Sequence, residues 1–139
     1  EFHAAMGLCV LPRVKEIIER REAISHLYDE LLADLPLKRP VMDERLTYNY
    51  AYYPVLFPSE KDLLKVRSLL NESDILPRRY FYPSLTELNY VKKQSAEMAE
   101  SIATRMLCLP MGYDLEETSI RQIAGIIQKH FITANVVQA

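Results

Sequence analysis

The spacing of apolar residues predicts two helices over the N-terminal quarter of the chain. The first covers residues 1–9, and Pro12 then stands where the first turn of a second helix tolerates proline. Apolar residues recur at helical spacing along the second helix and define one stripe, while Arg20, Arg21 and several glutamates cover the remainder. The members of the stripe are Val14, Ile17, Ile18, Ile24, Tyr28, Leu31 and Leu32. Two prolines within residues 34–40 end this helix and begin a loop.

From residue 48 onward the pattern alternates between strand-like and helix-like segments. Residues 48–57 are rich in aromatic and β-branched side chains and predict a strand, in which Pro54 indicates a sheet edge or a bulge. Ser59 is suited to cap the helix that follows, with Asp62 answering it three residues on. The apolar side of this helix consists of Leu63, Val66, Leu69 and Leu70.

Two further strand–helix units complete the pattern. Alternating aromatic residues predict a strand at 78–82, and Ser95 is predicted to cap the next helix. The inward residues of that helix are Ala96, Met98, Ala99, Ile102 and Ala103. Residues 106–110 are continuously apolar and predict a buried strand. The last helix follows a turn at 112–114 and is expected to end near His130, beyond which the pattern is weak. Its apolar positions are Leu115, Ile120, Ile123, Ala124 and Ile127.

The order of these elements predicts an α+β fold. We expect a single domain over residues 1–139, with helices over 1–34, strand–helix repeats over 48–128 and a tail at 131–139. The sheet is expected to have about three strands, with helices packed on one of its faces. Because no capping residue precedes the first helix, we also expect the chain to be cut from a longer protein.

Composition and charge narrow the classes of function. The chain has 139 residues, enough for one domain with a sizeable core, and its formal net charge of -2 provides no field that would attract nucleic acid or an anionic membrane. Its three glycines lie far apart, which excludes a glycine-rich phosphate loop. Cys9 and Cys108 are isolated thiols typical of a reducing compartment. We therefore expect a cytoplasmic protein with no nucleic-acid and no membrane partner.

No combination of residue types predicts a complete catalytic or metal site. His3, His26 and His130 lie on separate predicted elements, whereas zinc needs three or four convergent ligands. Neither Ser84 nor a cysteine has a nearby histidine base, and Cys108 lies in an apolar strand typical of an inert core thiol. The residues alone therefore predict a ligand-facing surface, with no catalytic residue and no metal.

The second predicted strand carries two arginines beside three aromatic residues. On a strand, Arg79 and Phe81 would share one face, while Arg78, Tyr80 and Tyr82 would share the other. A guanidinium can donate two parallel hydrogen bonds to a phosphate or carboxylate. A tyrosine offers a ring for stacking and a hydroxyl for hydrogen bonding. Which arginine faces a ligand stays open, because a slip of one residue in register exchanges their faces. A half-buried edge strand with solvated arginines would have the same pattern.

Five segments in order resemble the C-terminal domain of the DegT/StrS (DegT/DnrJ/EryC1/StrS) family, which consists of pyridoxal-phosphate-dependent sugar-nucleotide aminotransferases. The segments are residues 1–8, 17–21, 49–55, 78–85 and 107–110. Together they extend the resemblance from residue 1 to about residue 128. The resemblance implies the small C-terminal domain of the aspartate aminotransferase architecture, known as fold type I.

The resemblance also implies a function. In the intact enzyme, pyridoxal 5'-phosphate would carry an amino group from glutamate to a nucleotide-linked keto-sugar of the dTDP-keto-hexose type, in a homodimer serving cell-surface polysaccharide biosynthesis. The Schiff-base lysine would lie upstream of Glu1, in a large domain that this chain lacks. Residues 1–139 alone would then be inactive and hold no cofactor, contributing part of the substrate pocket and of the dimer interface. Cofactor-binding residues stay unidentified.

Within the resemblance, the candidate substrate-binding residues are Arg78, Arg79, Tyr80 and Tyr82. Tyr80 and Phe81 stand where many relatives carry a His-Tyr pair, which puts any role that needs an imidazole in doubt. Two alternatives remain. One is a non-catalytic module that uses the 78–82 strand to bind a nucleotide or to stack single-stranded nucleic acid. The other is a structural role for the apolar stripe of the second helix in dimerisation.

Overall fold

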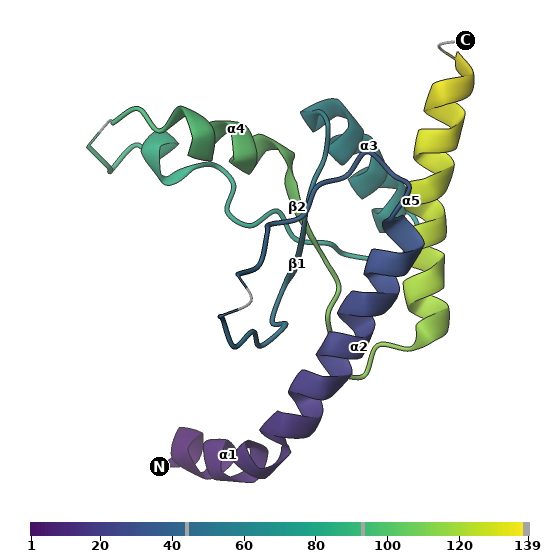
Figure 1. Cartoon of the computed structure of the whole chain (residues 1–139). Helices are drawn as coiled ribbons and strands as arrows, with labels where there is room; N and C mark the ends of the chain where they lie inside the picture. The colour runs from purple at the N-terminus through teal and green to yellow at the C-terminus, as the bar shows by residue number, and fades with distance from the viewer. Residues whose placement is uncertain (44, 93, 138–139) are drawn as a thin grey trace.

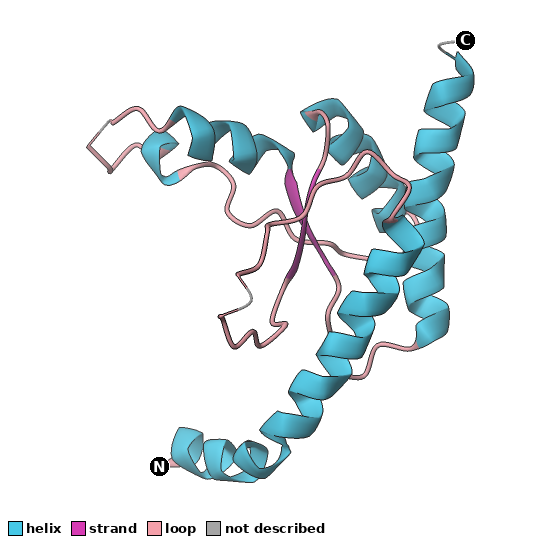
Figure 2. Ribbon diagram, in the orientation of Figure 1, coloured by secondary structure: helices cyan, strands magenta, loops and turns pink. Residues whose placement is uncertain are grey.

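The computed structural model describes residues 1–43, 45–92 and 94–137, and places helices around a small two-stranded sheet (Figure 1, Figure 2). In chain order the elements are α1 (Phe2–Val10), the 3₁₀ turn η1 (Leu11–Arg13), α2 (Val14–Leu32), β1 (Tyr53–Leu56), α3 (Glu60–Asn71), the 3₁₀ turn η2 (Leu85–Glu87), α4 (Glu97–Arg105), β2 (Met106–Leu109) and α5 (Glu117–Val137). The α+β class is confirmed. Within the described ranges, no helix combines the length and apolar character needed to cross a bilayer.

The sheet consists of β1 and β2, which pair antiparallel along their whole length. Isolated backbone bridges flank this pair, one between Lys38 and Leu56 and one between Arg78 and Cys108. The predicted buried strand at 106–110 is confirmed as β2, and Cys108 is buried within it.

The prediction of a strand at 78–82, and with it a third strand, is wrong. Arg78 exchanges two backbone hydrogen bonds with Cys108, at 3.1 and 2.8 Å, but the chain turns at Tyr80 and Phe81 directly afterwards. A single bridge cannot hold the following residues in the ladder. The alternating aromatic pattern therefore belongs to a turning segment, and its side chains are no longer sorted onto two faces.

Side chains of α2, α3 and α5 pack with the two strands in a single core. Burial alternates along β1, where Tyr53 and Val55 are buried while Pro54 and Leu56 are partly exposed. Figure 1 shows these three helices gathered to one side of the strands, whereas α4 extends away from them. The α2 stripe supplies the core only through its later members Ile24, Tyr28 and Leu32, whereas Val14 at its start is 39% exposed. Full burial of one such side chain stabilises the fold by about 1.5–3 kcal/mol. The bulkiest fully buried side chains are Tyr28, Tyr53, Phe57, Ile24, Leu63, Leu70, Leu107, Ile120, Ile123 and Ile127.

The start of α3 confirms the predicted cap. The Ser59 hydroxyl accepts a hydrogen bond from the Asp62 backbone N–H at 3.1 Å, and the Asp62 carboxylate binds that hydroxyl in return. This arrangement satisfies one of the free N–H groups of the first helical turn.

The first half of the predicted strand at 48–57 is wrong, because only its last part, Tyr53–Leu56, is extended. The Asn49 side chain accepts a hydrogen bond from the Ala51 backbone N–H at 3.0 Å, the contact that closes a local Asx turn. Tyr50 has a φ of 49°, in the left-handed region. Such a local turn is incompatible with a continuous strand.

The helix predicted to begin at Ser95 begins later. Ala96 occupies the N-cap of α4 without a side-chain cap, and the Glu100 carboxylate accepts from the Ala96 backbone N–H at 3.3 Å instead. Of the predicted inward residues only Ala103 is buried, and Met98 is 74% exposed. Its apolar side therefore lies outside the core formed by the other helices.

The last helix is longer than predicted. Residues 131–137, expected to be a tail, continue α5 as far as Val137, and residues 138–139 lie outside the described range. Phe131 is buried and stacks on Phe57, with ring centroids 6.3 Å apart. His130, predicted at a helix end, lies inside the helix and contacts the Asp62 carboxylate at 3.0 Å.

Candidate functional site

A hollow of about 400 Å³ opens beside the point where Arg78 bridges to β2. Its wall comes from α2, from the segment before β1, from residues 76–80 and from the end of β2. The lining residues are Arg21, Ala51, Tyr52, Leu76, Arg78, Tyr80, Cys108, Leu109, Pro110, Met111 and Gly112. Its volume lies in the range of about 300–1,000 Å³ that is typical of small-molecule sites.

Arg78 and Tyr80 lie together on the rim of this hollow. The Arg78 guanidinium donates to the Tyr80 hydroxyl at 2.5 Å, and this hydrogen bond raises the pKa of Arg78 further above its usual value. The Tyr80 ring meets Tyr52 edge to face, with centroids 5.4 Å apart. Arg78 is exposed and the backbone bridge to Cys108 holds its main chain in place. A permanent positive charge and two phenol rings therefore face the same open space.

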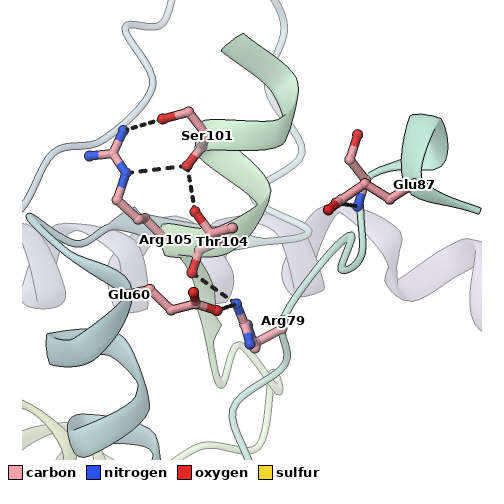
Figure 3. A network of polar contacts seen from close by, with 7 residues as sticks. Glu60, Arg79, Glu87, Ser101, Thr104 and Arg105 are labelled. Atoms are coloured by element: carbon pink, nitrogen blue, oxygen red, sulfur yellow. Dashed lines mark hydrogen bonds and ion pairs between the residues drawn. The ribbon is translucent and has the colours of Figure 1, made fainter. Parts of the chain in front are cut away.

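Arg79 points elsewhere. Its guanidinium is only 9% exposed and donates to the Glu60 carboxylate and to the Thr104 carbonyl oxygen, each at 2.8 Å (Figure 3). It also lies over the Tyr82 ring, with its central carbon 3.5 Å from the ring centroid. Arg79 thus ties the 78–82 segment to the start of α3 and the end of α4.

The predicted pairing of faces is therefore wrong in two ways. Tyr82, expected beside Arg78 and Tyr80, lies against Arg79, and neither Tyr82 nor Arg79 lines the hollow. Phe81, expected to face inward with Arg79, is 76% exposed. The cause is the turn at residues 80–81, which ends the two-residue alternation of a strand.

Polar contacts around Arg79 hold the neighbouring segments together. Glu87 accepts from the Ser84 backbone N–H at 3.0 Å in a capping box, and Arg105 contacts Ser101 within α4 (Figure 3). The Thr86 hydroxyl donates to Glu100 at 2.6 Å, and this hydrogen bond holds the pKa of the Glu100 carboxyl below its usual value. The Thr86–Glu100 hydrogen bond links η2 to α4, while the other two contacts stabilise η2 and α4 individually.

Arg21 is a lining residue that the sequence reasoning missed. It comes from α2 and stands four residues after Ile17 and three before Ile24, at a position of the apolar stripe. A charged residue in the inward-facing register of a helix is uncommon unless it has a partner or a ligand. That interruption of the stripe was the signal that could have found it.

The lining residues do not form a reactive centre. Within the described part of the chain they include no histidine, carboxylate or lysine, and no three metal-ligating side chains gather there or elsewhere. The Cys108 thiol is buried, and burial raises its pKa, which disfavours the nucleophilic thiolate. The hollow is thus equipped to bind an anion with an aromatic or sugar-like neighbour, by charge and stacking.

Comparisons with family models and with curated proteins identify aminotransferases. The model of the DegT/DnrJ/EryC1/StrS aminotransferase family matches residues 1–128. A dTDP-4-amino-4,6-dideoxy-D-glucose transaminase of Escherichia coli is 30% identical over 138 residues, covering 91% of this chain and 37% of the relative. A dTDP-4-dehydro-2,3,6-trideoxy-D-glucose 4-aminotransferase of Saccharopolyspora spinosa is 31% identical over 133 residues, covering 93% of this chain and 34% of the relative.

Solved structures agree in fold. The structure of DesI in the presence of its TDP-sugar product superimposes with a TM-score of 0.81 at 28% identity, over 95% of this chain and 37% of DesI. The aminotransferase TlmJ from Streptoalloteichus hindustanus gives a TM-score of 0.85 at 23% identity, over 94% of this chain and 36% of TlmJ. The chain therefore spans little more than a third of the length of these relatives.

Proposed function

Because the chain belongs to the DegT/DnrJ/EryC1/StrS aminotransferase family, we propose that it forms one wall of the substrate site in a sugar-nucleotide aminotransferase. The observation that carries this proposal is the open hollow in which Arg78 and Tyr80 meet. Two relatives named as transaminases of dTDP-linked sugars, at about 30% identity, support the same substrate class. Residues outside this chain would complete the cleft.

The proposed cofactor is pyridoxal 5'-phosphate, held by those other residues. In the described chain no lysine lines the hollow, so its side chains do not fit the covalent attachment of this cofactor. A structural relative, a putative sugar aminotransferase from Streptococcus pneumoniae, has been solved in a PLP-form. In our proposal the chain's own residues bind and orient the substrate, and they take no part in covalent chemistry.

The proposed roles separate the four candidate residues into two pairs. Arg78 would bind the phosphate side of the ligand, and Tyr80 would contact its sugar or stack against it. Arg79 and Tyr82 would position the segment that carries Arg78. Their side chains contact each other, and Arg79 also pairs with Glu60. Glutamate as the amino donor and a homodimer with a shared cleft complete the proposal.

The nucleic-acid alternative lacks a comparable observation. Its premise was a strand that presents stacked aromatic rings, and the described residues 78–82 form no strand. The net charge of -2 also provides no overall positive field that would attract a polyanion.

The test uses the complete protein, of which this chain would form one part, with a dTDP-linked keto-hexose and glutamate. We expect Arg78→Ala to raise KM for the sugar nucleotide about tenfold or more, since a hydrogen bond to a charged group is worth about 1.5–3 kcal/mol. KM for glutamate should stay unchanged. The matched control is Arg121→Ala, an exposed arginine whose guanidinium pairs with Glu117 on α5.

Two results would contradict the proposal. One is an unaltered sugar-nucleotide KM in Arg78→Ala. The other is an equal loss for both substrates together with a lowered melting temperature, because that pattern would make Arg78 a structural residue.

A further inference from the structure

Arg21 reaches the hollow from α2 without any visible counter-charge. In the described chain, no carboxylate lies within ion-pair distance of its guanidinium, and its Nε is buried with no hydrogen-bond partner. Arg21 as a whole is only partly buried, but its Nε is shielded from water without a hydrogen-bond partner in the described chain, and a buried polar atom in that state destabilises the protein unless something else binds it.

The acidic side chains nearest to Arg21 along α2 contact other partners. Glu19 pairs with Lys15 at 3.7 Å, and Glu22 accepts from the Tyr50 hydroxyl at 2.8 Å. The neighbouring Arg20 does not line the hollow and donates to the Leu115 carbonyl oxygen at 2.7 Å. The missing partner of Arg21 is therefore not supplied by the surrounding part of α2.

Arg78 is the second guanidinium of the hollow, and its side chain binds only the neutral Tyr80 hydroxyl. It too lies beyond ion-pair distance of every carboxylate that the structure describes. Two cations that share a cavity repel one another, and this repulsion is relieved by an anion between them. A diphosphate has two charged groups and enough oxygens to accept hydrogen bonds from both guanidinium groups.

We infer that Arg21 and Arg78 form a two-arginine subsite for the diphosphate of a nucleotide-linked ligand. This inference rests on the proposed function and adds to it a residue on a different element, 57 positions away in the chain. The phenol rings of Tyr52 and Tyr80 on the rim then face the sugar or the base.

The experiment measures binding to the complete protein by calorimetry, with dTDP, inorganic pyrophosphate and glutamate as separate probes. We expect Arg21→Met to weaken dTDP and pyrophosphate about ten- to a hundredfold while leaving glutamate unchanged. Methionine keeps an apolar stem in the stripe and removes the charge together with the N–H donors. Arg21→Lys should recover part of the affinity. Arg20→Met is the matched control and should bind like the wild type.

Binding of dTDP and pyrophosphate by Arg21→Met at wild-type strength, with the fold intact by circular dichroism, would overturn the inference. It would mean that Arg21 pairs with a carboxylate outside this chain. Loss of glutamate binding in place of dTDP binding would also overturn it, since the subsite would then take a carboxylate. Arginine-dependent dTDP binding in a protein that transfers no amino group would support the subsite while refuting the proposed function.

Discussion

Arg79 provides a test of how the segment carrying Arg78 is held. Its guanidinium, only 9% exposed, binds the Glu60 carboxylate and the Thr104 carbonyl oxygen and covers the Tyr82 ring. Removing one partner of a buried ion pair costs about 3–5 kcal/mol. Because the Glu60 side chain is 39% exposed, water can compensate part of that loss. We therefore predict that Arg79→Ala lowers the free energy of unfolding of the 139-residue chain by about 2–3 kcal/mol.

The assay is urea unfolding followed by circular dichroism, on wild type, Arg79→Ala, Glu60→Ala and the double variant. The cycle should give a coupling energy of about 1–2 kcal/mol between the two side chains, because they touch directly. Arg121→Ala, which breaks an exposed i,i+4 pair on α5, should stay within about 0.5 kcal/mol of wild type. A coupling energy near zero, or Arg79→Ala as stable as wild type, would refute the anchoring role of Arg79.

Two further predictions concern α3 and its neighbours. The Ser59 hydroxyl and then His130 hold the pKa of the Asp62 carboxyl below its usual value, so its stabilising effect is full above the unfolded pKa of about 4 and is lost as pH falls through the folded value. Asp62→Asn should therefore flatten the loss of stability below about pH 4 in urea titrations, whereas an unchanged acid slope would count against this pair. Leu63→Ala should cost about 2–5 kcal/mol in the same assay, because the side chain is fully buried, and a cost below about 1 kcal/mol would contradict the packing.

The parts of the fold that were predictable depend on local physical signals. Apolar residues at helical spacing marked the inward faces of α3, of α5 and of the later part of α2, because burial on one face imposes that period whatever the rest of the fold. The Ser59 cap was predictable because a hydroxyl three residues before a carboxylate forms a capping interaction within one helical turn, whatever the rest of the fold.

The parts that were not predictable depend on partners far away in the chain. The aromatic alternation at 78–82 satisfies a strand pattern, yet a strand also needs a ladder partner, and among the described residues only Cys108 pairs with this segment, through Arg78. Likewise, α5 continues past His130, where Asp62 contacts His130 and Phe57 stacks on Phe131, and no local pattern contains those contacts.

The sequence predicted the types of side chain at the candidate site, but not which residues line it. The sequence identified the guanidinium and phenol groups of 78–82, but sorting them required the turn that sends Arg78 toward the hollow and Arg79 into the protein. Arg21 lies far from them in sequence, and its signal was the one charged position within an apolar stripe.

A crystal structure of the complete protein with bound dTDP tests the central claim most directly. We predict that the diphosphate lies in the hollow, with its oxygens within hydrogen-bond distance of the guanidinium groups of Arg78 and Arg21. A bound dTDP whose phosphates contact neither arginine, with the hollow filled by other residues of the protein, would contradict it.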